Sequence, residues 1–231
     1  MKKFLVFALL LAFILPANAQ RYNAQQRQLY SDFLSSVRRC DLSAIKDAVY
    51  GNMPLNLNTA DEKYDTPLII AISGNCLKGA WMLFNAGAKP MPNKTTLVSP
   101  LNLIMDKYSS TAPGDWADFV SKLLEAGANA NFQNTYGENS LILAVKNDKA
   151  YYVEILLYES NVRFDLADND GRTALHWAAY YNYGDIAQLL LDAGANPNKK
   201  DKEGLTPLQL ARRMHNTYVA QIIEDFTGYT F

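Results

Sequence analysis

A three-residue motif returns along this chain at nearly fixed intervals, and this period constrains the fold more than any other feature. Each copy has Thr, Ser or Asn at its first place and Leu at its third, as in Thr66-Pro67-Leu68. Five copies start at residues 66, 99, 139, 173 and 206, so their spacings are 33, 40, 34 and 33 residues. Such a period is typical of stacked structural repeats, in which each unit buries its apolar face only against its neighbours.

A second motif keeps in phase with the first. Ala-Gly-Ala occurs at residues 86–88, 126–128 and 193–195, and each copy ends 11 residues before the next start of the first motif. In the repeat that holds the third copy, Thr173 is placed to cap a short helix, and the Leu and Ala residues after it have helical spacing. Gly194 is placed to end a second helix with left-handed backbone. Each repeat is therefore predicted to contain two helices.

The segment from Asp168 to Asn198 reads DNDGRTALHWAAYYNYGDIAQLLLDAGANPN and resembles the ankyrin-repeat family, whose pattern is G-x-T-P-L-H-x-A-A, two helices and G-A-x-x-N. The resemblance extends over essentially the whole chain after residue 19. It implies an all-α solenoid of stacked helix-turn-helix units joined by hairpin-like turns. The expected units are an N-terminal cap at 20–60, repeats at 61–93, 94–133, 134–167 and 168–200, and a C-terminal cap at 201–231.

Three units depart from the regular pattern. The unit that starts at Ser99 holds about seven extra residues between its helices, most simply at 108–115. This Ser/Pro/Gly stretch indicates a protruding loop, which is either a binding element or a tolerated surface insertion. The unit that starts at Asn139 has one additional residue, placed near 148–151. The last unit is expected to have a truncated second helix that closes the stack.

The N-terminus has the three regions of a secretory signal peptide. Two lysines are followed by an apolar stretch of 12 residues, Phe4 to Leu15, and then by Pro16-Ala17-Asn18-Ala19. Residues 1–19 are therefore read as a signal peptide that is cleaved after Ala19. The apolar stretch is too short to span a membrane, so no membrane anchor is expected. The signal looks bacterial, which favours the periplasm, with secretion beyond it as the alternative.

Net charge and cysteine content indicate the class of partner and the redox state of the compartment. Loss of Lys2 and Lys3 with the signal leaves 20 basic and 23 acidic side chains, a formal charge near −3, which is unlike a nucleic-acid-binding surface. Cys40 and Cys76 fall in the helix-to-helix turns of adjacent units. In an oxidising compartment such a pair is usually bridged, and the other interpretation is two separate buried thiols.

Motifs for catalysis or cofactor binding are missing from the sequence. It contains no G-x-x-x-x-G-K, G-x-G-x-x-G, G-x-S-x-G or H-E-x-x-H. Of the two histidines, His176 occupies the family's structural histidine position, and His215 is expected in the turn between the last two helices. The acidic run at 168–170 does not make a calcium loop, because Trp177 stands where the bidentate acid is needed. We therefore expect no enzymatic activity, no catalytic residues, no metal and no cofactor.

The resemblance implies that a protein partner binds the concave surface, which is made by the hairpin turns and the ends of the first helices. Tyrosine and arginine are common among the residues that dominate binding energy. The alternative is that the exposed aromatic residues have no function, or that the tyrosines pack against the neighbouring turn. Trp116 is a weaker candidate, and Trp81 and Trp177 are read as packing residues. The partner-binding candidates are Tyr136, Lys146, Arg172, Tyr180, Tyr181 and Arg213.

The expected function is thus a periplasmic protein-interaction module that is monomeric on its own. The resemblance implies two more specific roles. One is an immunity protein that neutralises a toxic effector, and the other is a helper of an oxidative-stress enzyme such as catalase. An enzyme built on the repeats would need catalytic groups in the 108–115 loop, whose sequence offers none.

Overall fold

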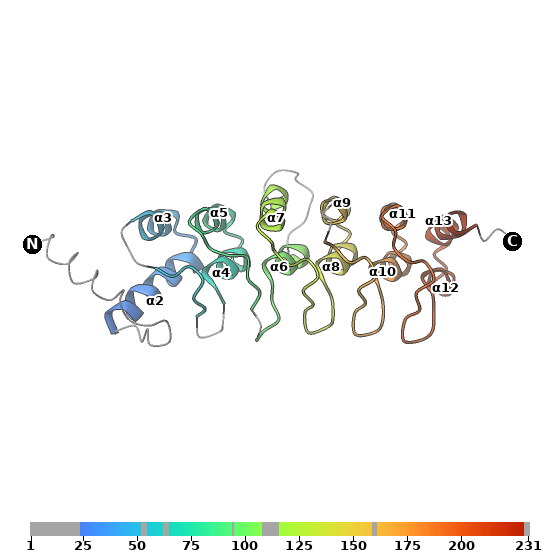
Figure 1. Cartoon of the computed structure of the whole chain (residues 1–231), viewed down its shortest axis with the longest axis horizontal. Helices are drawn as coiled ribbons and strands as arrows, with labels where there is room; N and C mark the ends of the chain where they lie inside the picture. The colour runs from blue at the N-terminus through green and yellow to red at the C-terminus, as the bar shows by residue number, and fades with distance from the viewer. Residues whose placement is uncertain are drawn as a thin grey trace, which may run out of the picture.

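A computed structural model describes residues 24–51, 55–61, 65–93, 95–107, 116–158 and 161–228. Within these ranges the chain forms six consecutive pairs of α-helices and one isolated β-bridge, between Asn93 and Val98. The pairs lie side by side in a row from the N-terminus to the C-terminus (Figure 1). The prediction of an all-α solenoid is confirmed. The expected signal peptide and the 108–115 insertion lie outside the described residues.

Each unit contributes a first and a second helix. The first helices lie in one layer and the second helices in another, and the loops between units project from the first-helix layer on the side away from the second helices (Figure 1). The pairs are α2 (Ala24–Arg38) and α3 (Leu42–Tyr50), α4 (Pro67–Ser73) and α5 (Leu77–Asn85), α6 (Pro100–Lys107) and α7 (Trp116–Glu125), α8 (Ser140–Lys146) and α9 (Ala150–Tyr158), α10 (Ala174–Tyr181) and α11 (Gly184–Asp192), and α12 (Pro207–Arg213) and α13 (Thr217–Thr227).

Small residues allow the first helices to stack closely. Ala71, Ala144, Ala178 and Ala211 are fully buried, and each lies in a first helix that contacts the first helix of a neighbouring unit. Their buried leucine and isoleucine neighbours join them in one apolar core that runs along the stack. No helix among the described residues combines the length and apolar character needed to cross a membrane.

The repeated three-residue motif stands at the start of the first helix in each of the five units after the N-terminal one. The side chains of Thr66, Asn139 and Thr206 accept hydrogen bonds from the backbone N–H groups three residues later, at 3.4, 2.9 and 3.3 Å. Such caps satisfy donors that the first turn of a helix leaves without partners. The Pro that follows two of these caps is suited to the first helical position. The motif therefore encodes helix starts, as predicted.

The second motif follows three of the second helices, α5, α7 and α11. Gly194 has φ +97°, in the left-handed region that an L side chain rarely adopts. The predicted turn at this glycine is thus confirmed. His215 lies in the turn between α12 and α13 with φ 57°, as expected from its place in the sequence.

Two expectations about the irregular units are wrong. The second helix begins 11 residues after the first-helix cap in the unit of Asn139 just as in the unit of Thr173, so the extra residue does not lie near 148–151. It lies between Tyr158 and Val162, after α9, where residues 159–160 are outside the described part. The final helix is not truncated either, since α13 has 11 residues and α11 has 9. Glu224 of this helix forms an ion pair with Arg212 of α12, 2.7 Å apart.

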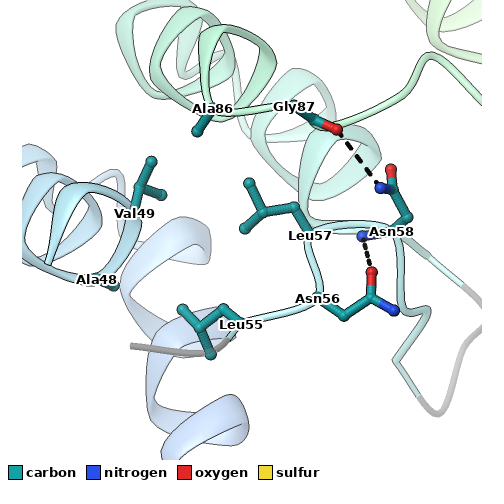
Figure 2. A pocket seen from close by; sticks show the side chains of 8 residues that line it. All are labelled: Ala48, Val49, Leu55, Asn56, Leu57, Asn58, Ala86 and Gly87. Carbon is teal, nitrogen blue, oxygen red and sulfur yellow. Dashed lines mark hydrogen bonds between the residues drawn. The ribbon is translucent and has the colours of Figure 1, made fainter. Parts of the chain in front are cut away.

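Asparagine and aspartate side chains close the seams between units. The Asn58 amide donates to the Gly87 carbonyl (3.4 Å), and its oxygen accepts from the Lys89 N–H (2.7 Å). Figure 2 shows the Asn58–Gly87 bond beside a pocket that α3, residues 55–58 and the Ala86-Gly87 turn line with apolar and amide side chains. Asn131 makes the equivalent bonds two units later, beside an equivalent pocket. These pockets repeat with the fold and are better explained as seams than as ligand sites.

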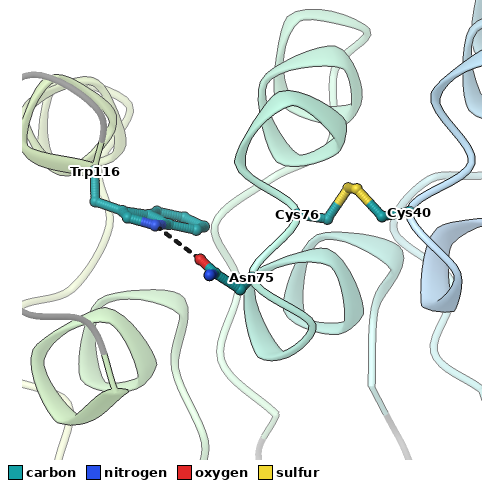
Figure 3. The surroundings of a disulfide bond; sticks show 4 residues. All are labelled: Cys40, Asn75, Cys76 and Trp116. Carbon is teal, nitrogen blue, oxygen red and sulfur yellow. Dashed lines mark hydrogen bonds between the residues drawn. A yellow bond between two sulfur atoms is a disulfide. The ribbon is translucent and has the colours of Figure 1, made fainter.

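In three units, the residue after the left-handed turn reaches back to the preceding unit. Cys76 forms a disulfide with Cys40, with Cα atoms 5.5 Å apart (Figure 3). Lys149 Nζ donates to two carbonyl groups in α6, one of them Ile104 at 3.1 Å. Asn216 Nδ2 donates to two carbonyl groups in α10, at 2.8 and 2.7 Å. The same position thus supplies either a covalent or a polar connection, and the interpretation of two separate thiols is not supported.

Candidate protein-binding surface

Aromatic rings form a compact group at the end of α10. Trp177 and Tyr181 stack with centroids 5.8 Å apart and an interplanar angle of 22°. Tyr183 continues the stack beyond Tyr181, at 5.5 Å and 25°. Tyr180 meets Trp177 and Tyr181 edge-on, at 5.6 and 5.0 Å. Both offset-stacked and edge-on arrangements are favourable for aromatic rings, so these side chains are held in defined positions.

Two cations lie against the Trp177 ring. Lys146 comes from the end of α8, and its Nζ lies 4.4 Å from the ring centroid. The Arg172 guanidinium comes from the hairpin before α10 and lies 5.3 Å from the same ring and 5.7 Å from Tyr180. The indole N–H donates to Asp168 Oδ2 at 2.8 Å, which fixes the orientation of the ring. Cation–π attraction therefore orders both basic side chains.

The next hairpin brings carboxylates to the arginines. Arg172 Nη2 lies 3.1 Å from Glu203 Oε1, and its Nε lies 3.6 Å from Asp201 Oδ2. Arg213, at the end of α12, holds Glu203 from the other side, with Nη2 3.3 Å from Oε1. The hydrogen bond from Arg213 lowers the pKa of Glu203, so this carboxylate is charged at neutral pH.

The structure brings five of the six predicted residues into one continuous surface. Lys146, Arg172, Tyr180 and Tyr181 surround Trp177, and Arg213 joins them through Glu203. We call these seven side chains the Trp177 surface, which is made by Lys146, Arg172, Trp177, Tyr180, Tyr181, Glu203 and Arg213.

Tyr136 stands apart from this group. It lies in the hairpin at 134–138 and is 69% exposed. Its carbonyl accepts a hydrogen bond from the Asn169 N–H at 2.9 Å, so its hairpin is joined to the next one. The same hairpin carries Glu138, which pairs with Lys146. Tyr136 therefore extends the face that carries the Trp177 surface toward the N-terminus.

The roles of Trp177 and Tyr183 at the centre of this surface were not predicted in full from the sequence. Trp177 does pack, being 9% exposed, but it is also the ring that orders both cations. Tyr183 was not among the candidates. In the sequence, Tyr183 is marked only by its place two residues after Tyr181. This spacing does not predict that the two rings stack, because α10 ends between them and the geometry of the turn decides where Tyr183 lies. Trp116 is 9% exposed and donates to Asn75 Oδ1 at 3.2 Å, so it has a structural position.

His176 has a structural environment. It is fully buried, its Nδ1 accepts from the Thr173 N–H (3.2 Å), and its Nε2 donates to the Leu205 carbonyl (3.1 Å). Burial lowers its pKa, which keeps the ring neutral. The ring therefore closes the first turn of α10 and ties it to the next hairpin. Within the described ranges, no group of three or more His, Cys, Asp or Glu side chains could hold a metal ion.

Comparison with known proteins agrees with this architecture. Residues 111–201 match the family model of ankyrin repeats in three copies. An ankyrin-repeat protein of fowlpox virus, FPV031, is 39% identical over 110 residues, which are 45% of this chain but only 32% of that protein. The chain therefore spans about a third of this relative. The Escherichia coli ankyrin-repeat protein YahD is 25% identical over 202 residues, covering 85% of this chain and 96% of YahD.

Solved structures share the fold over most of the chain. An ankyrin-repeat domain from Acinetobacter baumannii has a TM-score of 0.71 and 28% identity, covering 85% of this chain and 97% of that one. A chain in the structure of a predatory endopeptidase from Bdellovibrio bacteriovorus in complex with an immunity protein has a TM-score of 0.68 and 25% identity, covering 84% and 96%. The motifs, the helix pairs and these similarities together identify this chain as one that contains ankyrin repeats and has the fold of ankyrin-repeat proteins.

Proposed function

We propose that this protein binds a protein partner through the Trp177 surface. Ankyrin repeats mediate protein–protein interaction, and proteins built from them are in general binding modules without enzymatic activity. The observation that carries the proposal is the ordered group of one Trp, two Tyr and two Arg side chains on the face of the hairpins and first helices. Such residues dominate the energy of many interfaces, and their order in the free protein reduces the entropy lost on binding.

The test uses the full chain with a C-terminal affinity tag, expressed in its native host. Tyr181→Ala removes a ring that is 39% exposed in the Trp177 surface. Tyr158→Ala is the matched control, because Tyr158 is 91% exposed at the end of α9 in the second-helix layer. We expect one partner to be retained by the wild type and by Tyr158→Ala, and its affinity to fall about tenfold or more in Tyr181→Ala. Retention that depends on Tyr158 instead would refute the proposal.

We also propose the periplasm as the location. The signal-like sequence at 1–19 and the disulfide between Cys40 and Cys76 support this, since disulfides persist in oxidising compartments. Cell fractionation and the intact mass of the tagged protein test it. The expected form starts at Gln20 and is found in the periplasmic fraction. A cytoplasmic protein that keeps Met1 would contradict the proposal.

The more specific role that we favour is neutralisation of a toxic effector. It is supported by the similarity to a chain in a complex of an endopeptidase with an immunity protein. In this role the captured partner is a toxic enzyme, and equimolar addition of this protein abolishes its activity. If the partner is instead a catalase or another peroxide-removing enzyme that stays active in the complex, the stress-helper role replaces it.

A further inference from the structure

We propose that the Trp177 surface recognises a carboxylate group of its protein partner, and that this carboxylate takes the place of Glu203 between Arg172 and Arg213. The inference rests on the proposed function, because it concerns the same surface. It names the chemistry that the partner presents there, namely an acidic segment.

Two acidic residues of this region are already used by the fold. Asp168 Oδ1 accepts the backbone N–H groups of Asp170 and Arg172, both at 2.9 Å. Asp201 Oδ1 accepts the N–H groups of Glu203 and Leu205, at 2.9 and 3.0 Å. The side chain of Asp201 is 1% exposed. Both carboxylates shape the hairpins. Asp201 is buried, and the half-buried Asp168 also accepts a hydrogen bond from the Trp177 indole N–H.

Glu203 differs from these residues in its exposure. Its side chain is 51% exposed, and its two oxygens are held by Arg172 and Arg213 from two different units. Among the side chains of the Trp177 surface it supplies the single negative charge, against the positive charges of Lys146, Arg172 and Arg213. Lys146 keeps its pair with Glu138, and Asp201 stays 3.6 Å from Arg172 Nε. Displacement of Glu203 would therefore leave Arg213 and the Nη2 side of Arg172 for an incoming carboxylate next to the aromatic stack.

Displacement of Glu203 is energetically feasible. Exposed ion pairs contribute little to stability, because water competes with them and both side chains lose freedom in the pair. A carboxylate that is covered by a partner makes stronger charge-assisted bonds with arginine. Arg172 keeps its position without Glu203, since Trp177 and Tyr180 pack against its guanidinium, 5.3 and 5.7 Å away. The site is therefore preorganised for an incoming acid.

The experiment measures binding of a fluorescent hexaglutamate peptide to the full chain by anisotropy, with hexaglutamine as the neutral probe. Glu203→Gln removes the carboxylate that Arg172 and Arg213 share, whereas Arg213→Gln removes one of the two arginines. Glu125→Gln is the matched charge control, because Glu125 is 57% exposed and pairs with Lys122 on another face. We expect Glu203→Gln to bind hexaglutamate about threefold tighter or more, Arg213→Gln to bind more weakly, and Glu125→Gln to match the wild type.

Three results would overturn the inference. They are equal binding of the two peptides, no gain or a loss of affinity in Glu203→Gln, and an equal gain in Glu125→Gln, which would indicate a general charge effect. Circular dichroism of each variant confirms that the fold is intact. The proposed function is tested separately by the co-purification experiment, and it fails if no partner is lost in Tyr181→Ala. If a partner is retained through Tyr181 while Glu203→Gln gains no affinity for hexaglutamate, the surface binds protein without recognising a carboxylate.

Discussion

The ammonium group of Lys146 lies 4.4 Å from the centre of the Trp177 ring, so two successive repeats meet over one aromatic side chain. Lys146 also pairs with Glu138, whose side chain is 8% exposed. One lysine thus connects the hairpin of its own unit, the end of α8 and the first helix of the next unit. Since repeat proteins gain most of their stability from contacts between neighbours, this lysine is expected to contribute to folding as well as to binding.

Replacement of Lys146 by Met tests this contribution. The variant keeps the length of the side chain but loses the cation–π contact with Trp177. It also leaves Glu138 Oε1 without its cation. We expect the free energy of unfolding to fall by about 1–2 kcal/mol. Urea denaturation measures it, with Lys122→Met as the control. Lys122 is 51% exposed in a surface pair with Glu125, so its loss should cost less than about 0.5 kcal/mol. Equal effects would mean that Lys146 behaves as an ordinary surface residue.

Reduction of the Cys40–Cys76 disulfide is expected to destabilise the N-terminal unit. The two cysteines are 36 residues apart, and closing a loop of this length restricts the unfolded chain by about 3–4 kcal/mol. Hydrogen exchange in the presence of a phosphine reductant should therefore accelerate in α2 to α5 and stay unchanged in α10 to α13. A double Cys40→Ala/Cys76→Ala variant should behave like the reduced protein and not respond to reductant. Uniform acceleration along the stack would show that the units do not open separately.

Features set by local chemistry were predictable from the sequence. A capping residue needs only its own side chain and the next backbone N–H groups, so the sequence alone places Thr66 and Thr206 at helix starts. Glycine favours left-handed backbone whatever the neighbouring units are, which is why the turn at Gly194 was assigned correctly. The disulfide followed less directly, because the repeat alignment brought Cys40 and Cys76 to adjacent turns but could not fix their distance.

Features set by neighbouring units were not predictable in the same way. The unit of Asn139 lacks the Ala-Gly-Ala motif, so no second marker locates its additional residue. The position of that residue follows only from the residue at which α9 begins. The Arg212–Glu224 pair joins α12 to α13, and the sequence pattern does not reveal it. The aromatic stack depends on how Tyr183 turns back after α10, and the Trp177 surface as a whole depends on three successive units. A repeat pattern specifies the units, but the side chains that meet between them must be found in three dimensions.

The buried His176 predicts a pH dependence of stability. Its pKa is lowered from 6.5 in the folded state by burial, so the unfolded chain binds the proton more readily. The stabilising contribution is fully present above pH 6.5 and is lost as the pH falls through the lowered folded-state pKa. Urea denaturation between pH 5 and pH 8 should therefore show decreasing stability below about pH 6.5.

His176→Gln is the control for this dependence, because Gln209 already fills the same place in the capping box of Thr206. The variant should lose about 1 kcal/mol with the hydrogen bond to Leu205, and its stability should vary less with pH in this range. An unchanged pH profile in His176→Gln would assign the dependence to other groups.

Gly194 and Tyr181 separate folding from binding. Gly194→Val places a branched side chain in a left-handed turn with φ +97°, where no atom lies within 4 Å of the added Cβ, so the cost is backbone strain and not a clash. We expect the free energy of unfolding to fall by about 1–2 kcal/mol, and by less in Gly194→Asn, because asparagine tolerates this conformation better.

Tyr181→Ala loses its stacking on Trp177 and Tyr183, and its free energy of unfolding should fall by about 1 kcal/mol. In thermal melts Gly194→Val should therefore unfold first while retaining partner binding in its folded state, whereas Tyr181→Ala should melt later but bind weakly. If Tyr181→Ala melts earlier than Gly194→Val, the aromatic stack is chiefly a structural element of the repeats.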